Sequence, residues 1–291
     1  MNKLRLKGKF TQVIGILAAA LGAAILMTSW NVFEGPRKKI RQSDYEAALS
    51  CLPFHTPVPD LSGLIDYFGA KVEVTRSDEV SVGDALYEEY LEADMLFSVP
   101  SKLQHVFDRV VLELKYTEGC SYDYKLHYLG DNGEINAYTM GGRVYVTQGM
   151  LDFVESDDEL ACVLSHELFH NELGHINDDL STFHSSVQLA KGMGFTWEDA
   201  VDLGAGANEV EKLLFPAFNH DEELMCDLHG VDLAESAGYD GCAARNFWLR
   251  MSQQVASDPL ESLLSTHPGA ADRSSCIYSH VDRHYDVPCS Q

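Results

Sequence analysis

The sequence His166-Glu167-Leu168-Phe169-His170 is an HExxH pattern, the arrangement by which a single helix offers two imidazoles to a zinc ion. Residues four apart on a helix lie about 40° apart around its axis, so both rings can reach one ion. Glu167 lies beside them, where it can take a proton from a zinc-bound water. Because the chain has 12 histidines, an accidental match has a chance of roughly a few per cent, and the structural context has to support the motif.

A zinc ion bound by two histidines needs a third protein ligand and an open position for water. His175 follows His170 by five residues. The pattern HExxHxxGxxH, however, requires Gly at +3 and His at +6 from the second histidine. This chain has Leu173 and Ile176 at those positions, so the spacing excludes that pattern.

Glu223 is the better candidate for the third ligand. Glu223 and Asp227 share one face of a predicted helix, and Gly230 on the same face permits a close approach between helices. His166, His170 and Glu223 would then hold one zinc ion per chain, with Asp227 orienting an imidazole through its free N–H. An isolated Glu-x-x-x-Asp pair is normally a solvated helix face, so this interpretation depends on the upstream motif.

The two histidines are expected on a helix that continues to Asn171. Ser156 and Glu159 form a capping-box pattern at its start, and Gly174 is a plausible stop signal. The face opposite the histidines is apolar, which predicts an amphipathic helix with its back in the core; it carries Ala161, Leu164 and Leu168.

A second capping box, formed by Asn219 and Glu222, predicts that the Glu223 helix begins there and ends near residues 237–238. Two more helices and two strands are predicted upstream, over 80–97, 101–114, 124–128 and 143–147. The fold class that follows is α+β, mostly helical, with a small β-sheet ahead of the HExxH helix.

The amino terminus carries an uncharged apolar run over residues 13–27, with basic residues on both sides. With its flanks it is about 20 residues long, which marginally suffices to span a bilayer. We therefore expect residues 1–30 to be an uncleaved membrane anchor, with a cleaved export signal as the alternative. Residues 31–79 are predicted to form a linker and amino-terminal extension, and 80–291 the metal-binding domain on the extracytoplasmic, periplasmic side.

The formal net charge of −24 predicts a surface that repels phosphate backbones, so we expect no nucleic-acid partner. The seven cysteines are odd in number, and connectivity cannot be deduced from their spacing. Cys162 and Cys226 fall on the predicted helices and are expected to be buried free thiols. Export would permit disulfides among the others, which are Cys51, Cys120, Cys242, Cys276 and Cys289.

Four segments, in order, resemble the gluzincin metallopeptidases that include HtpX, the CAAX prenyl proteases and their soluble periplasmic relatives. Residues 136–151 are similar to that family's NAF…GG…GLL stretch, and 158–170 to its ELAxVLxHExxH helix. Residues 223–240 resemble its ExxADxxG…AGYD helix, and 266–273 its THPxxxxR segment. The resemblance covers about residues 80–280 and implies a zincin-like metallopeptidase domain.

The resemblance implies zinc held by His166, His170 and Glu223, with Glu167 as the general base. It also implies that the strand around residues 136–146 lies at the cleft edge. There, an extended substrate backbone can pair by strand addition, and the residues implied in substrate binding are Asn136, Ala137 and Tyr138.

His267 is implied to lie near the cleft, where it can donate a hydrogen bond to the developing oxyanion; a structural histidine is the alternative. Arg273 is expected to be an ion-pair partner. The chain departs from the family pattern at His220, Cys226 and Gly241, which concerns the electrostatics on the substrate side and leaves every ligand present.

We therefore predict a zinc-dependent endopeptidase that acts on unfolded or misassembled envelope proteins. The alternative from another class is a non-catalytic, zinc-stabilised binding module or chaperone on a peptidase scaffold. A third interpretation is a latent peptidase in which residues 176–218 cover the cleft as a lid, with helices near 184–192 and 197–215.

Overall fold

The structure is a computed structural model of the 291-residue chain. The residues that it describes are 42–52, 73–117, 119–130, 133–181, 185, 218–253, 267, 270–285 and 289. The chain divides into two compact units, Met1–Lys39 and Ile40–Gln291. Every described residue lies in the second unit.

Within the described residues, four strands form one mixed sheet in the order β1-β2-β4-β3. The strands are β1 (Leu96–Phe97), β2 (Lys125–Leu129), β3 (Ala137–Met140) and β4 (Arg143–Thr147). β2 and β4 are parallel, whereas the other two pairs are antiparallel. Gly141 and Gly142 join β3 to β4 with φ of 59° and 82°, backbone angles that glycine adopts without strain in a tight hairpin.

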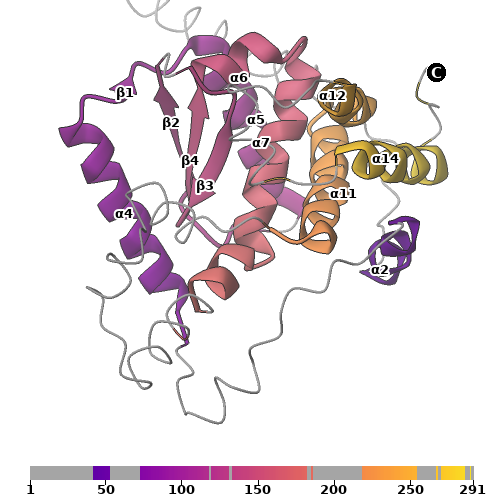
Figure 1. The fold of residues 1–291 in the computed structure, drawn as a ribbon, viewed down its shortest axis with the longest axis horizontal. Helices are drawn as coiled ribbons and strands as arrows, with labels where there is room; N and C mark the ends of the chain where they lie inside the picture. The colour runs from indigo at the N-terminus through magenta and orange to yellow at the C-terminus, as the bar shows by residue number, and fades with distance from the viewer. Residues whose placement is uncertain are drawn as a thin grey trace, which may run out of the picture. The chain divides into compact units, whose positions relative to one another are not determined.

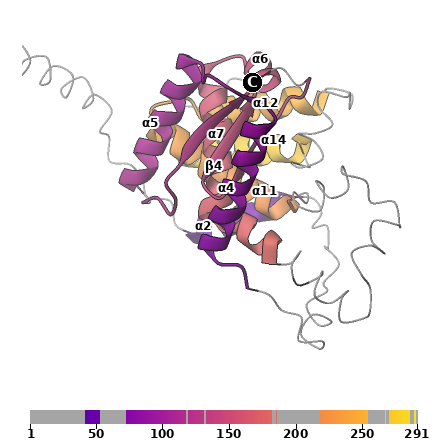
Figure 2. The same ribbon diagram turned by 90° about the vertical axis from the view of Figure 1, so that its left-hand side faces the viewer.

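The helices of the described residues lie in layers on the two sides of this sheet. They are α2 (Gln42–Ala48), the 3₁₀ helix η2 (Leu49–Cys51), α4 (Arg76–Glu92), α5 (Ser101–Thr117), α6 (Gln148–Phe153), α7 (Asp157–Glu172), α11 (His220–Ser236), α12 (Cys242–Gln253) and α14 (Ala270–His284). Figures 1 and 2 show α4 along one face of the sheet and α7 on the opposite face, with α11 beside α7. The expected α+β class, mostly helical with a small sheet ahead of the HExxH helix, is confirmed.

The central helix α7 is buried on all sides from Glu159 to Asn171. The predicted burial of the apolar face is confirmed, but the face that carries the histidines is buried as well. The reason is the place of α7 between two layers, because β3 packs on one side and α11 and α12 on the other. A helix enclosed in this way has no solvated stripe.

The capping box predicted at the start of α7 is half formed. The Ser156 hydroxyl accepts the Glu159 backbone N–H at 3.1 Å, as expected. The Glu159 carboxylate, however, accepts from the Glu155 backbone N–H at 2.8 Å and forms an ion pair with Arg250 on α12. The carboxylate thus accepts from the N–H one residue before the expected one and gains a partner distant in the sequence.

Other boundaries follow the predictions closely, with one exception. The structure begins the predicted helix 80–97 earlier, at Arg76, where Thr75 and Asp78 form a capping box. It also ends that helix earlier, because Asp94 adopts a φ of 54° and residues 96–97 pair with β2 as a strand. The capping box of Asn219 and Glu222 at the start of α11 is fully formed, as predicted.

Two disulfide bonds connect the carboxy-terminal helices to distant segments. Cys51 pairs with Cys276, which joins η2 to α14, and Cys242 pairs with Cys289. The expectation that Cys162 and Cys226 are buried free thiols is confirmed. Cys120 is likewise free, and its side chain is half-buried.

None of the helices in the described part of the chain is long and apolar enough to cross a membrane. The expected anchor, residues 1–30, lies outside the described residues, as do the helices expected near 184–192, apart from Ser185, and 197–215. The division into 1–30, 31–79 and 80–291 stays a prediction.

Candidate metal centre

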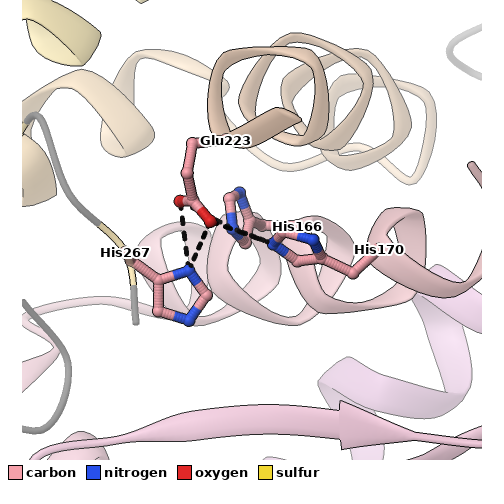
Figure 3. Close-up of side chains that lie close together, drawn as sticks. All are labelled: His166, His170, Glu223 and His267. Carbon is pink, nitrogen blue, oxygen red and sulfur yellow. Dashed lines mark hydrogen bonds and ion pairs between the residues drawn. The ribbon is translucent and has the colours of Figure 1, made fainter. Parts of the chain in front are cut away.

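The centre forms where α7 and α11 cross. Gly230 of α11 lies against the α7 backbone: a Cβ atom at this position would be 3.0 Å from the His166 nitrogen and 3.2 Å from its Cα. Only glycine leaves room for so close an approach without a shift of one helix. As expected from the sequence, this contact brings the Glu223 side chain of α11 over the histidines of α7 (Figure 3).

The donor atoms of the three predicted ligands converge. His166 Nε2 and His170 Nε2 lie 3.0 Å apart. One Glu223 carboxylate oxygen is 3.6 Å from His166 Nε2, and the other is 3.4 Å from His170 Nε2. Ligand atoms around a tetrahedral zinc ion, bound at about 2.0–2.2 Å, are separated by about 3.4 Å. The residues present therefore fit a zinc ion.

His267 is part of the cluster itself, whereas the resemblance implies only a position near the cleft. Its Nδ1 is 3.0 Å and 3.1 Å from the two carboxylate oxygens of Glu223. Its Nε2 is 3.7 Å from the Glu167 carboxylate. His166, His170, Glu223 and His267 together offer four donor atoms within 4.8 Å of one another (Figure 3).

Asp227 contacts His166 on the side of its ring that faces away from the cluster. Its Oδ1 is 3.0 Å from His166 Nδ1, the ring nitrogen opposite the cluster. The carboxylate is itself fixed, because it accepts the Trp248 indole N–H at 3.1 Å and two N–H groups of Arg273 at 2.6 Å and 2.7 Å. This geometry favours the tautomer that leaves His166 Nε2 free for a metal.

Arg273 connects the two acidic residues of α11. Besides Asp227, its guanidinium contacts a Glu223 carboxylate oxygen at 2.5 Å. It lies 3.5 Å above the centre of the Trp248 ring. Arg273 is fully buried and forms ion pairs with both carboxylates, as expected from the sequence.

The buried charges set the pKa values of the carboxyl groups in opposite directions. Burial alone would raise the pKa of Glu223, but Arg273 and His267 outweigh it and hold that pKa well below its usual range. Asp227 is kept ionised in the same way, by Arg273 and His166 against burial. Both carboxylates thus stay negative without the metal, which favours binding of a cation.

Glu167 differs from these two residues. Burial raises its pKa, and the nearby His267 and His166 only partly offset this effect. The pKa of His170 is held well below its usual range by burial, so this imidazole is neutral and has a lone pair to offer. A carboxyl with an elevated pKa is suited to accepting a proton.

Three contacts of the cluster were not identified from the sequence. His175 Nδ1 lies 3.2 Å from His170 Nδ1, on the side of the ring away from Glu223, and Cys226 Sγ is 3.4 Å from His175 Nδ1. The Phe218 ring stacks on His170 with centroids 3.8 Å apart. None of these residues has a local pattern that predicts such a contact.

The strand implied at the cleft edge is β3, at one end of the sheet order. Ala137 and Tyr138 lie on it, and Asn136 precedes it; the Tyr138 hydroxyl donates to Tyr90 at 2.6 Å. Asn171 of α7 fixes the β3–β4 hairpin, since it accepts the Gly142 backbone N–H at 3.1 Å and donates to Thr139 of β3.

The chain is similar in sequence to a known protein family. The model of the family described as Peptidase family M48 matches residues 100–280. The chain is 28% identical over 146 residues to the mitochondrial metalloendopeptidase OMA1 of Arabidopsis thaliana, a match that covers 49% of this chain and 29% of that protein.

Two bacterial proteins are similar over comparable lengths. The metalloprotease LoiP of Escherichia coli is 24% identical over 162 residues, 55% of this chain and 62% of LoiP. The beta-barrel assembly-enhancing protease of Yersinia pestis is 28% identical over 152 residues, 48% of this chain and 31% of that protein. The chain thus spans less than two thirds of the length of these curated relatives.

Proposed function

The chain belongs to peptidase family M48, and we propose that it is a zinc-dependent endopeptidase. One observation carries the proposal: two helices bring together side chains that are 53 residues apart between His170 and Glu223. The Nε2 atoms of His166 and His170 lie 3.0 Å apart, and each is 3.4–3.6 Å from a Glu223 carboxylate oxygen. His166, His170 and Glu223 would hold one zinc ion per chain, and Asp227 would orient His166.

The protein residues divide the chemistry between them. When bound, zinc polarises the scissile carbonyl and lowers the pKa of a water molecule. Glu167 takes the proton of the attacking water at its carboxylate and passes it to the leaving amine nitrogen. Since Glu223 and Glu167 outweigh burial and raise the pKa of His267, the His267 Nε2–H is suited to donate to the developing oxyanion.

Pairing with the edge strand β3 would set the direction in which a substrate peptide lies across the site. An extended peptide that pairs with Ala137 and Tyr138 through backbone hydrogen bonds would pass along α7, because Asn171 holds the β3–β4 hairpin against that helix. Binding through the substrate backbone requires an unfolded or locally unfolded segment. This supports unfolded or misassembled polypeptides as substrates.

We place the domain outside the cytoplasm, tethered by an anchor within residues 1–30. The two disulfide bonds support an oxidising compartment, and the apolar run with its basic flanks supports export. The name of the Yersinia pestis relative, a beta-barrel assembly-enhancing protease, is in keeping with substrates among envelope proteins.

Replacement of the general base tests the proposal directly. Glu167→Gln is expected to keep bound zinc and to lose casein cleavage, whereas Glu172→Gln, on the same helix and outside the cluster, is expected to cleave as the unmodified chain does. Undiminished cleavage by Glu167→Gln would refute the assignment. If the unmodified chain binds zinc and unfolded casein but cleaves none, with or without a chelator, the chaperone alternative gains the support.

A further inference from the structure

Two histidines and a cysteine bring their donor atoms together on the side of His170 that faces away from Glu223. His175 Nδ1 is 3.2 Å from His170 Nδ1 and 3.4 Å from Cys226 Sγ. One donor atom from each of these three residues lies within 4.8 Å of the others. His170 contributes the ring nitrogen that the proposed zinc site leaves over, because its Nε2 faces His166 and Glu223. The proposed mechanism uses neither His175 nor Cys226.

Local features of the chain place the two additional residues. Gly174, directly after the end of α7, has a φ of 83°, a left-handed conformation that glycine adopts without strain and that turns the chain. His175 follows this turn and lies beside His170. On α11, Cys226 comes three residues after Glu223, so the two side chains share a helix face. The crossing of α7 and α11 that forms the first cluster therefore also forms this second one.

Hydrogen bonds alone satisfy the second cluster poorly. A His170 ring that binds zinc through Nε2 keeps a proton on Nδ1, and the Cys226 thiol has a proton of its own. Both groups lie within hydrogen-bonding distance of the same nitrogen, His175 Nδ1. A neutral imidazole nitrogen has one lone pair and accepts one of these two protons well. A single cation in place of both protons would engage all three donor atoms.

The distances and the donor types suit a thiophilic metal ion. Around a tetrahedral zinc ion, bound at about 2.0–2.1 Å by nitrogen and about 2.3 Å by sulfur, two nitrogens are about 3.4 Å apart and a nitrogen and a sulfur about 3.5 Å. The separations of 3.2 Å and 3.4 Å in this cluster are close to these values. Thiolate and imidazole donors favour zinc-like ions over magnesium and calcium, which prefer oxygen ligands.

We propose that His175 and Cys226, together with Nδ1 of His170, form a second and weaker site for zinc or another thiophilic divalent cation. Binding releases the thiol proton of Cys226 and the Nδ1 proton of His170 to solvent, and His170 then bridges the two ions as an imidazolate. The ion can enter beside His175, which is half-buried, whereas Cys226 is fully buried.

The shared histidine makes this site the weaker of the two. The second ion has to displace a further proton from the His170 ring and is repelled by the first dication. The site therefore fills only when the metal is in excess, and at one equivalent the chain holds a single ion. The inference rests on the proposed zinc site through His170, and it does not depend on peptide cleavage.

Cobalt(II) titration of the metal-free full chain tests the second site. A thiolate bound to cobalt(II) gives an intense near-ultraviolet charge-transfer band, which imidazole and carboxylate ligands do not give. The first equivalent should bind without this band, since His166, His170 and Glu223 offer no sulfur. The second equivalent should produce the band. A band that develops with the first equivalent, or no band in excess cobalt, would overturn the proposal.

Three variants assign the band to its ligands. Cys226→Ala introduces the residue that the ExxADxxG pattern has at this position, and it should bind the first equivalent but lose the band completely. His175→Ala should likewise lose the band. Cys120→Ser removes a free thiol outside the cluster and is the matched control, which should keep the band. A band that persists in Cys226→Ala or His175→Ala, or that disappears in Cys120→Ser, would refute the assignment.

Casein cleavage by the chain with one equivalent of zinc separates this inference from the proposed function. A chain that shows the thiolate band with the second equivalent of cobalt but cleaves no casein would support the second site and overturn the endopeptidase function alone. A chain that cleaves casein but never shows the band would overturn the second site alone.

Discussion

Arg273 connects Glu223, the proposed metal ligand, to Asp227, the proposed orienting residue. Its replacement should make the free energy of unfolding depend on bound zinc. Its guanidinium is fully buried and contacts both carboxylates at 2.5–2.7 Å. Arg273→Met keeps much of the side-chain volume but leaves two buried negative charges without the guanidinium that pairs with both. Removing one member of a buried ion pair costs about 3–5 kcal/mol, so we expect a loss of about that size in the metal-free protein.

Zinc should restore part of this loss, because a divalent cation beside Glu223 supplies positive charge to the same carboxylates. The assay is urea unfolding of the unmodified chain and Arg273→Met, each with zinc and with a chelator. A domain stability of about 5–15 kcal/mol leaves room to measure the difference. Arg283→Met, an exposed position on the same helix, is the control. The reasoning fails if Arg273→Met loses no more unfolding free energy than Arg283→Met does. It also fails if zinc does not reduce the difference in unfolding free energy between Arg273→Met and the unmodified chain.

Three further predictions follow from single contacts. Asp227→Asn removes the charge that orients His166 and should weaken zinc binding about 10–100-fold in chelator competition; unchanged affinity would argue against an orienting role. Gly230→Ala places a methyl group 3.0 Å from the His166 backbone nitrogen and should cost about 1–3 kcal/mol in urea unfolding, whereas a gain would mean that the helices separate easily. Burial raises the pKa of Glu79, and a raised folded-state pKa means stability that is lost as pH rises through it. Glu79→Gln should therefore gain stability relative to the unmodified chain as pH rises above the ordinary pKa of a glutamate, and a pH-independent difference would contradict this.

The parts of the site that the sequence predicts are those with local signals. The four-residue spacing of His166 and His170 fixes their shared helix face. The capping box of Asn219 sets the start of α11, and hence the angular position of Glu223 and Gly230 on it. Each signal lies within about one helical turn, so it can be recognised without knowledge of the rest of the fold.

The parts that it does not predict depend on contacts between distant segments. Glu159 leaves its expected capping partner for Arg250, 91 residues away. Trp248 contacts Asp227 only because α12 packs against the ligand helices. The enclosure of α7 likewise arises from the packing of several elements, and no local sequence pattern encodes such packing.

The central claim is that His166, His170 and Glu223 hold one zinc ion. The most direct measurement is the zinc content and affinity of Glu223→Gln beside Glu222→Gln, the same change one residue earlier on α11, where Gln can still serve the helix cap. We predict one zinc per chain for the unmodified protein and for Glu222→Gln, and an affinity lower by more than about 100-fold for Glu223→Gln. Equal zinc affinity in the two variants would contradict the account.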